Sequence, residues 1–328
     1  MRGIFLLFVS LVLLQAEVSE LRIAKQYGLG ALPFNVLDEF KLVQKHAKAA
    51  GLGDVKVTWA TFGGGAATND ALLSGNIDIN YNGIAPFVIL WDKSKGKVKA
   101  IAAAGEIPIV LNTVNPNVKS IKDLTDSDRI ALPAAKVSIQ AILLQIETAK
   151  IYGIKNFDKF DHLTVTLKDP DAIVALTSKN PQITTHFTSE PFASIEQQNP
   201  NVRQLLTLES VLGKSYTAVV ISTTEKFYKA NPKTVKALVD ALDEANRWIE
   251  NNKEEAVRLY LKANNSKEPF ELIYSILNRP NFKFTIKPTD ITVFSDFLYE
   301  TGTIKSKPTQ KELFFEGALE EESGGGCG

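Results

Sequence analysis

Two glycine-containing turns are the stretches of this sequence best suited to hold a small molecule through the backbone. Glycines occupy positions 63–65, shortly after the segment 55–59, and Asn82 and Gly83 directly follow the segment 77–81. Because glycine lets a backbone approach closely and leaves its N–H groups accessible, the expected chemistry is hydrogen bonding to a polar or anionic ligand. The glycine run is equally compatible with a plain flexible turn.

Each of these turns is expected to join a strand to a helix. Residues 55–59 and 77–81 alternate as strands do, whereas the segments after the turns have helical spacing, with Pro86 inside the first helical turn. In an open parallel sheet both turns fall at the carboxyl edge, where helix N-termini offer unpaired N–H groups. No Lys-Ser/Thr follows the glycines, and the spacing Gly-x-Gly-x-x-Gly is absent, so a nucleotide site is not predicted.

Two further turns place polar side chains in comparable positions. A strand over 21–26 ends at Gln26 and Tyr27, and apolar spacing predicts one helix over 34–50 behind it. Ser138 begins another predicted helix, where its hydroxyl would either contact a ligand or only cap the helix.

Several short motifs occur in an order and spacing typical of one protein family. They are Ala71-Leu-Leu-Ser-Gly-Asn-Ile-Asp-Ile, Asn82-Gly-Ile-Ala-Pro-Phe, Ser120-Ile-Lys-Asp-Leu, Asp169-Pro-Asp-Ala-Ile-Val-Ala-Leu and Ser189-Glu-Pro-Phe. Through them the sequence from residue 21 to about 315 resembles the periplasmic solute-binding proteins of ABC importers, in the nitrate, taurine and sulfonate branch that includes thiamine-precursor binders. The resemblance implies an α/β fold of two lobes (type II), each a mostly parallel sheet flanked by helices, with a ligand cleft between the lobes.

The resemblance also implies how the chain divides between the lobes. Lobe 1 is expected to be discontinuous, with residues 17–111 and 219–318, and lobe 2 to contain residues 112–218. Residues 319–328 are predicted to form a flexible, glycine-rich tail.

In the resembled proteins the turn near residue 188 contributes to the cleft, which adds His186, Thr188 and Ser189 as candidates. His186 suits a structural role equally well, and Tyr216, at the return crossing, either covers a ligand or packs against the hinge. The full set of expected ligand-binding residues is Gln26, Tyr27, Gly64, Gly65, Asn82, Gly83, Ser138, His186, Thr188, Ser189 and Tyr216.

The first 16 residues predict a cleavable signal peptide. Met1 and Arg2 precede an apolar run over 4–14 that is short for a membrane span, and Ala16 stands at the expected cut. No cysteine stands at that cut, so we expect a periplasmic protein without a lipid anchor. The single cysteine, Cys327, leaves no disulfide within one chain.

Charge and missing motifs restrict the function classes. The sequence has 37 basic and 37 acidic residues, which favours neither nucleic acid nor an anionic membrane as a partner. Its three histidines are widely spaced, and neither Gly-x-Ser-x-Gly nor His-Glu-x-x-His occurs, which favours binding without turnover, cofactor or metal.

The resemblance implies a monomeric receptor that captures nitrate, a sulfonate or a taurine-like solute. Such a receptor would deliver its ligand to the membrane permease of an ABC importer with its ATPase. The alternative is an enzyme on the same fold, because relatives of the thiamine-precursor binders include a pyrimidine-forming enzyme that uses histidine.

Overall fold

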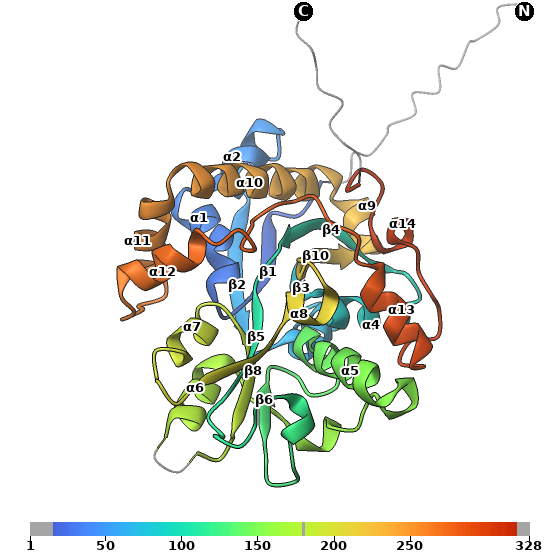
Figure 1. Cartoon of the computed structure of the whole chain (residues 1–328). Coiled ribbons are helices and arrows are strands. Elements are labelled where there is room, and N and C mark those ends of the chain that lie inside the picture. The colour runs from blue at the N-terminus through green and yellow to red at the C-terminus, as the bar shows by residue number, and fades with distance from the viewer. Residues whose placement is uncertain (1–15, 179–180, 320–328) are drawn as a thin grey trace, which may run out of the picture.

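The computed structural model describes residues 16–178 and 181–319 and arranges them in two lobes, one above the other in Figure 1. The predicted signal peptide up to residue 15, and residues 320–328 of the predicted tail, lie outside the described residues. The strands of lobe 1 are β1 (Glu20–Gln26), β2 (Lys56–Phe62), β3 (Asn80–Gly83), β4 (Val98–Gly105) and β10 (Val219–Thr224). The strands of lobe 2 are β5 (Ile109–Thr113), β6 (Ile130–Leu132), β7 (Thr164–Thr166), β8 (Thr185–Ser189) and β9 (Arg203–Thr207).

Both lobes combine parallel strands with antiparallel neighbours. In lobe 1, β1 pairs in parallel with β2, with Ile23 opposite Trp59, and a parallel bridge joins Ile23 to Ile79 just before β3. There β10 lies antiparallel between β3 and β4. In lobe 2 the order is β7-β6-β8-β5-β9; β6, β7 and β8 are parallel, and β5 runs antiparallel to β8 and β9. The predicted two-lobe α/β fold is confirmed, with the antiparallel strands where the chain passes between lobes.

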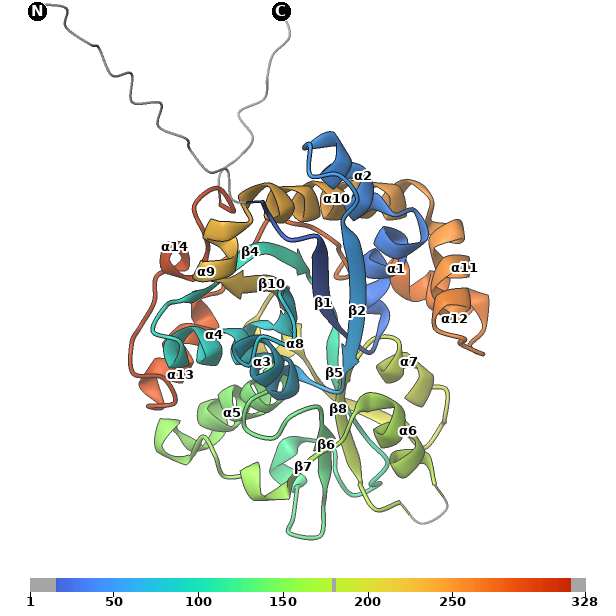
Figure 2. The same cartoon turned by 180° about the vertical axis from the view of Figure 1, so that it is seen from behind.

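The helices cover these sheets (Figures 1 and 2). Those of lobe 1 are α1 (Leu32–Glu39), α2 (Leu42–Ala49), α3 (Gly65–Leu73), α4 (Ile84–Lys93), α9 (Glu225–Ala230), α10 (Pro232–Asn251), α11 (Lys253–Ala263), α12 (Phe270–Leu277), α13 (Thr292–Glu300) and α14 (Gln310–Leu313). Those of lobe 2 are α5 (Ile139–Tyr152), α6 (Asp169–Thr177), α7 (Phe192–Glu196) and α8 (Leu208–Leu212). α10 buries Leu238, Ala241 and Leu242 and packs on α1 and α2, so it supports the sheet from the side away from lobe 2.

The chain crosses from lobe 1 to lobe 2 between β4 and β5, and it returns between α8 and β10. β5 pairs with β8 over residues 109–113, so the predicted lobe boundary after residue 111 falls inside a strand of lobe 2. The strand pairing thus places the first crossing closer to residues 106–108.

The single helix predicted over 34–50 is wrong. α1 ends at Glu39, Lys41 adopts a left-handed φ of 50°, and α2 begins at Leu42. The break leaves the Phe40 ring 4.9 Å from the Trp248 ring of α10, so a tertiary contact accompanies the interruption of the helical pattern.

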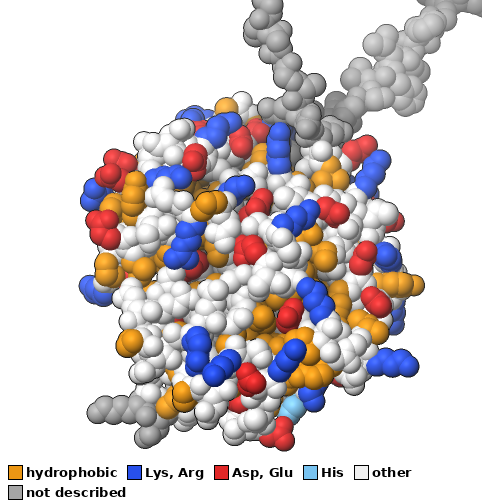
Figure 3. Space-filling view, in the orientation of Figure 1, with side chains coloured by type: hydrophobic (Ala, Val, Ile, Leu, Met, Phe, Trp, Pro, Cys, Tyr) orange, Lys and Arg blue, Asp and Glu red, His pale blue; other side chains and the backbone are white. Residues whose placement is uncertain are grey.

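The surface carries no extended region of one charge on the face shown in Figure 3, where the described basic and acidic side chains are interspersed. Within residues 16–178 and 181–319, no helix combines the length and the apolar character that a membrane crossing requires.

Candidate functional site

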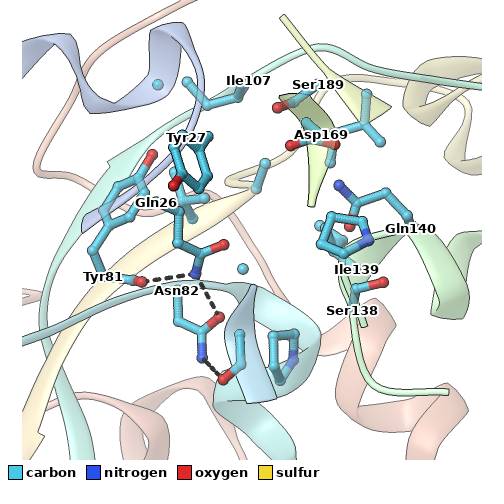
Figure 4. A pocket seen from close by; sticks show the side chains of 18 residues that line it. Gln26, Tyr27, Tyr81, Asn82, Ile107, Ser138, Ile139, Gln140, Asp169 and Ser189 are labelled. Carbon is cyan, nitrogen blue, oxygen red and sulfur yellow. Dashed lines mark hydrogen bonds between the residues drawn. The ribbon is translucent and has the colours of Figure 1, made fainter. Parts of the chain in front are cut away.

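A cavity of about 60 Å³ lies between the lobes, and residues from both lobes line it (Figure 4). The lining consists of Gln26, Tyr27, Gly30, Gly65, Tyr81, Asn82, Gly83, Pro86, Ile107, Ile109, Pro133, Ser138, Ile139, Gln140, Asp169, Ser189, Ala218 and Val219. In Figure 4 the lobe 1 side chains Gln26, Tyr81 and Asn82 face the lobe 2 side chains Gln140 and Asp169 across this space. A molecule held there would contact both lobes at once.

A network of amide side chains forms the lobe 1 wall. Gln26, at the end of β1, donates from Nε2 to the Tyr81 carbonyl oxygen at 3.0 Å and to Asn82 Oδ1 at 3.3 Å. Asn82 in turn donates from Nδ2 to the Gly65 carbonyl oxygen at 3.2 Å and to Asn69 Oδ1 at 2.8 Å. These bonds fix the ends of β1 and β3 against the start of α3.

Glycine is required at position 65 because of this network. A Cβ atom there would lie 2.2 Å from Asn82 Oδ1 and 2.7 Å from Pro86 Cγ, which is too close for any other residue. Gly65 therefore serves close packing between α3 and the turn after β3, in addition to its place on the cavity wall.

Three helices begin at this cavity. α3 starts at Gly65, α4 follows Gly83, and α5 follows Ser138, whose Oγ accepts a hydrogen bond from the Ala141 N–H at 3.2 Å. The first turn of a helix has N–H groups without a partner inside the helix, and its dipole favours negative charge. This part of the cavity is therefore suited to an anionic or hydrogen-bond-accepting group of a ligand.

The lobe 2 wall adds two polar residues that are each only 6% exposed, Gln140 and Asp169. Within the described part of the chain, the Gln140 side-chain amide makes no hydrogen bond, and Figure 4 shows it directed toward Asp169. Asp169 uses Oδ1 to accept from Thr188 Oγ1 at 2.8 Å and from His186 Nε2 at 3.2 Å. Its Oδ2 has no hydrogen-bond donor among the described residues.

Behind Asp169, His186 forms a buried charge cluster with two carboxylates. The His186 side chain is fully buried, with Nδ1 at 2.5 Å from Glu196 Oε1 and Nε2 facing Asp169. Burial alone would lower the pKa of His186, but its hydrogen bonds to Asp169 and Glu196, together with their charges, raise it to about 9. The ring is therefore an imidazolium at neutral pH, and it fixes Asp169 from the side away from the cavity.

Seven of the residues predicted from the sequence line the cavity: Gln26, Tyr27, Gly65, Asn82, Gly83, Ser138 and Ser189. The other four do not. Gly64 lies beside Pro133 in a separate hollow. His186 and Thr188 are buried behind Asp169. Tyr216 packs on the hydrophobic core, with Lys214 Nζ 4.9 Å from its ring centre. These four residues are placed around the site, and none of them faces the cavity.

The sequence predicts no ligand contact for Asp169, Gln140, Tyr81 or Gly30, which all line the cavity. Asp169 is the first residue of α6, and a carboxylate at that position is common for the helix dipole alone, so its residue type does not indicate a ligand contact. Burial raises the pKa of the Tyr81 phenol, which therefore stays protonated at neutral pH. A Cβ atom on Gly30 would lie 2.6 Å from the Tyr81 phenol oxygen, so this position requires glycine. Gln140 is a polar residue in the first turn of α5, directly after Ser138, and this position is the only feature of the sequence that could have indicated a ligand contact.

Replacing Gly64 with alanine is expected to separate the lobes. The new Cβ would lie 2.6 Å from the Pro133 carbonyl oxygen of lobe 2, and the backbone φ of 175° at Gly64 is an extended conformation that alanine adopts without strain. The substitution thus disturbs the contact between Gly64 and Pro133 without straining the backbone at position 64. Small-angle scattering should give a larger radius of gyration for Gly64→Ala than for the wild type. Asp70→Ala, an exposed change on α3 outside this hollow, is the control; equal radii for all three chains would contradict the expectation.

Among the described residues no group of three or more His, Cys, Asp or Glu side chains is arranged to hold a metal ion.

Comparison with known proteins gives a family and a shared fold. The model of the NMT1-like family matches residues 15–261. The structure is similar to the alkanesulfonate-binding protein SsuA of Xanthomonas axonopodis pv. citri bound to MOPS, with a TM-score of 0.72 and 18% identity over 92% of this chain and 99% of that one. It is also similar to the periplasmic nitrate-binding protein NrtA of Synechocystis PCC 6803, with a TM-score of 0.61 and 17% identity over 79% of this chain and 70% of that one.

A Candida albicans protein described as defining a new family with the generic periplasmic binding protein fold gives a TM-score of 0.67 and 16% identity over 88% of this chain and 92% of that one. No curated protein matches the sequence significantly.

Proposed function

The chain belongs to the NMT1-like family, and from this premise we propose that it is an extracytoplasmic solute-binding receptor of an ABC importer. It captures a small polar or anionic solute, of the nitrate, sulfonate or taurine kind, in the cavity between its lobes. It then presents the loaded form to a membrane permease that works with an ATPase. We further propose that a signal peptide ending near Ala16 directs it to the periplasm, where it acts as a monomer without a lipid anchor.

The observation that carries this proposal is that residues of both lobes line the cavity. Gln26, Tyr81 and Asn82 come from lobe 1, whereas Ser138, Gln140 and Asp169 come from lobe 2. A ligand that contacts both walls stabilises their approach, and a permease can recognise loaded protein only if the ligand changes the relation between the lobes. The two crossings, before β5 and before β10, are the segments at which such a movement would be absorbed.

Binding without turnover also agrees with the surroundings of His186. Both of its ring nitrogens face carboxylates, its side chain is fully buried, and it does not line the cavity. A general base must reach the proton that it removes, so this histidine is poorly placed for the enzyme alternative. Two of the three named structural relatives, SsuA and NrtA, are binding proteins, which favours the same conclusion.

A thermal-shift screen of residues 17–328 tests the proposal. The protein is partly unfolded and dialysed to remove bound ligand, refolded, and mixed with nitrate, bicarbonate, small sulfonates, aminosulfonates, carboxylates and pyrimidines. A true ligand at about a hundred times its dissociation constant adds roughly 2.7 kcal/mol to the free energy of unfolding, which corresponds to several degrees. We expect such a shift from one chemical class. The absence of any shift, together with native mass spectra of freshly purified protein that show no bound small molecule, would contradict the receptor function.

A further inference from the structure

One lining residue of the interlobe cavity differs from all the others in charge. Asp169 is the only acidic or basic residue in the lining, because the rest of the lining is apolar, amide, hydroxyl or phenol. No lysine, arginine or histidine among the described residues lines this cavity. A carboxylate at this position repels an anion placed beside it.

The exposed oxygen of Asp169 lacks a partner. Oδ1 is occupied by Thr188 and His186, whereas Oδ2 has no donor within residues 16–178 and 181–319, although the side chain is only 8% exposed. A nearly buried carboxylate oxygen without a donor is costly, so Oδ2, which lines the cavity side of Asp169, indicates a donor that a ligand would supply. Gln140, equally buried and directed toward Asp169 in Figure 4, would hold the same part of a ligand.

His186 does not neutralise this charge. Its single positive charge lies between two carboxylates, Asp169 and Glu196, so the cluster as a whole keeps one negative charge. Glu196 has a further donor in Asn112 Nδ2 at 2.9 Å and is itself fully buried, away from the cavity. The uncompensated charge is therefore presented to the cavity through Asp169 alone.

From these observations we propose that the solute carries a protonated nitrogen, an ammonium or amidinium group, which binds Asp169 Oδ2. The proposal rests on the receptor function above and narrows it. The opposite part of the cavity, where α3, α4 and α5 begin, accepts an anionic or hydrogen-bond-accepting group. The preferred ligand is consequently a small zwitterion or a cationic polar molecule, and nitrate or a simple alkanesulfonate is a poor ligand.

Matched ligand pairs test the proposal on the wild-type chain. The pairs are 2-aminoethanesulfonate with ethanesulfonate, 3-aminopropionate with propionate, and acetamidine with acetamide, each titrated by calorimetry against stripped protein. We expect the nitrogen-bearing member of at least one pair to bind about tenfold or more tightly than its partner, which is the usual effect of a hydrogen bond to a charged group.

Asp169→Asn should remove this preference. The change keeps the size of the side chain and an oxygen that can accept from Thr188, so the fold is expected to persist, which circular dichroism checks. Asp171→Asn is the matched control, because Asp171 stands in the same helical turn, is exposed, and pairs only with Lys168 Nζ at 3.5 Å. In the control the preference should be unchanged.

The outcomes separate this inference from the receptor function. Tight binding of nitrate, ethanesulfonate or propionate to the wild type, with no gain from the added nitrogen, would overturn the inference and leave the receptor function intact. A preference for the nitrogen-bearing ligand that survives in Asp169→Asn would also overturn it. If no compound of the pairs or of the wider screen binds and nothing co-purifies, the receptor function fails and the inference fails with it.

Discussion

Replacing His186 with leucine is expected to lower the free energy of unfolding by about 3–5 kcal/mol, because Asp169 and Glu196 would lose the cation that they share. Leucine fills a similar volume but offers neither charge nor donor. The midpoint of urea unfolding, followed by tryptophan fluorescence, measures the loss. His162→Gln is the control, since His162 pairs with Asp126 on the surface and such exposed pairs contribute at most about 1 kcal/mol. A loss below about 1 kcal/mol for His186→Leu would contradict a charged cluster at this position.

The same cluster predicts how stability depends on pH. The pKa of His186 is raised from 6.5 to about 9 in the folded protein, so folding favours the protonated ring. Its contribution is fully present below about pH 6.5 and is lost progressively as the pH rises through about 9. The difference between the two values corresponds to roughly 3 kcal/mol. Wild-type stability should fall over this range more steeply than that of His186→Leu, and parallel curves for the two proteins would be the contrary result.

The strand-to-helix turns could be predicted from the sequence because their signals are local. The glycines at 63–65 follow β2, as the sequence predicts. The strand predicted over 77–81 is displaced, because Asn82 and Gly83 are the last residues of β3 and pair with β10, so the second turn begins after them. Seven of the eleven expected ligand-binding residues line the cavity for the same reason: a residue at the carboxyl end of a strand in this fold is close to the cleft.

The residues that the sequence did not identify depend on contacts between distant segments. Asp169 becomes a candidate only when β8 places His186 and Thr188 on one side of it and the cavity lies on the other. His186 was considered for its chemistry, but nothing local shows that Glu196, ten residues later, occupies its second ring nitrogen. The break between α1 and α2 is similar, because the contact between Phe40 and Trp248 joins segments more than two hundred residues apart.

A second group of charges ties the two lobes together next to Ser189, which lines the cavity. Arg279 follows α12, in a segment held to lobe 1 by the Ala103 N–H of β4, which donates to the Ile286 carbonyl oxygen at 2.9 Å. Its guanidinium pairs with Glu190 of lobe 2 through Nη1, and its Nη2 donates to Ser194 Oγ at 2.9 Å. The Glu190 side chain is only 1% exposed, and its backbone carbonyl oxygen accepts from the Leu29 N–H of lobe 1 at 2.8 Å. Glu190 is therefore sheltered only while the lobes are together.

Arg279→Ala is expected to shift the protein toward an open arrangement of the lobes. Without the guanidinium, Glu190 keeps only Ser194 as a donor, and separation of the lobes allows water to reach it. A loss of about 2 kcal/mol from the closed form changes the ratio of closed to open molecules by about 30-fold. Ligand affinity should fall, and small-angle scattering should show a larger radius of gyration at partial saturation.

Arg258→Ala is the matched control for this prediction, because Arg258 pairs with Glu254 within α11 and both side chains are exposed. It removes the same guanidinium without affecting a contact between lobes, so its scattering curve and affinity should match the wild type. Arg279→Lys keeps the charge but loses the second donor to Ser194, and we expect an intermediate effect. If Arg279→Ala binds ligand and scatters like Arg258→Ala, the pair with Glu190 does not control closure, and the hinge movement must be limited by the contacts around the cavity itself.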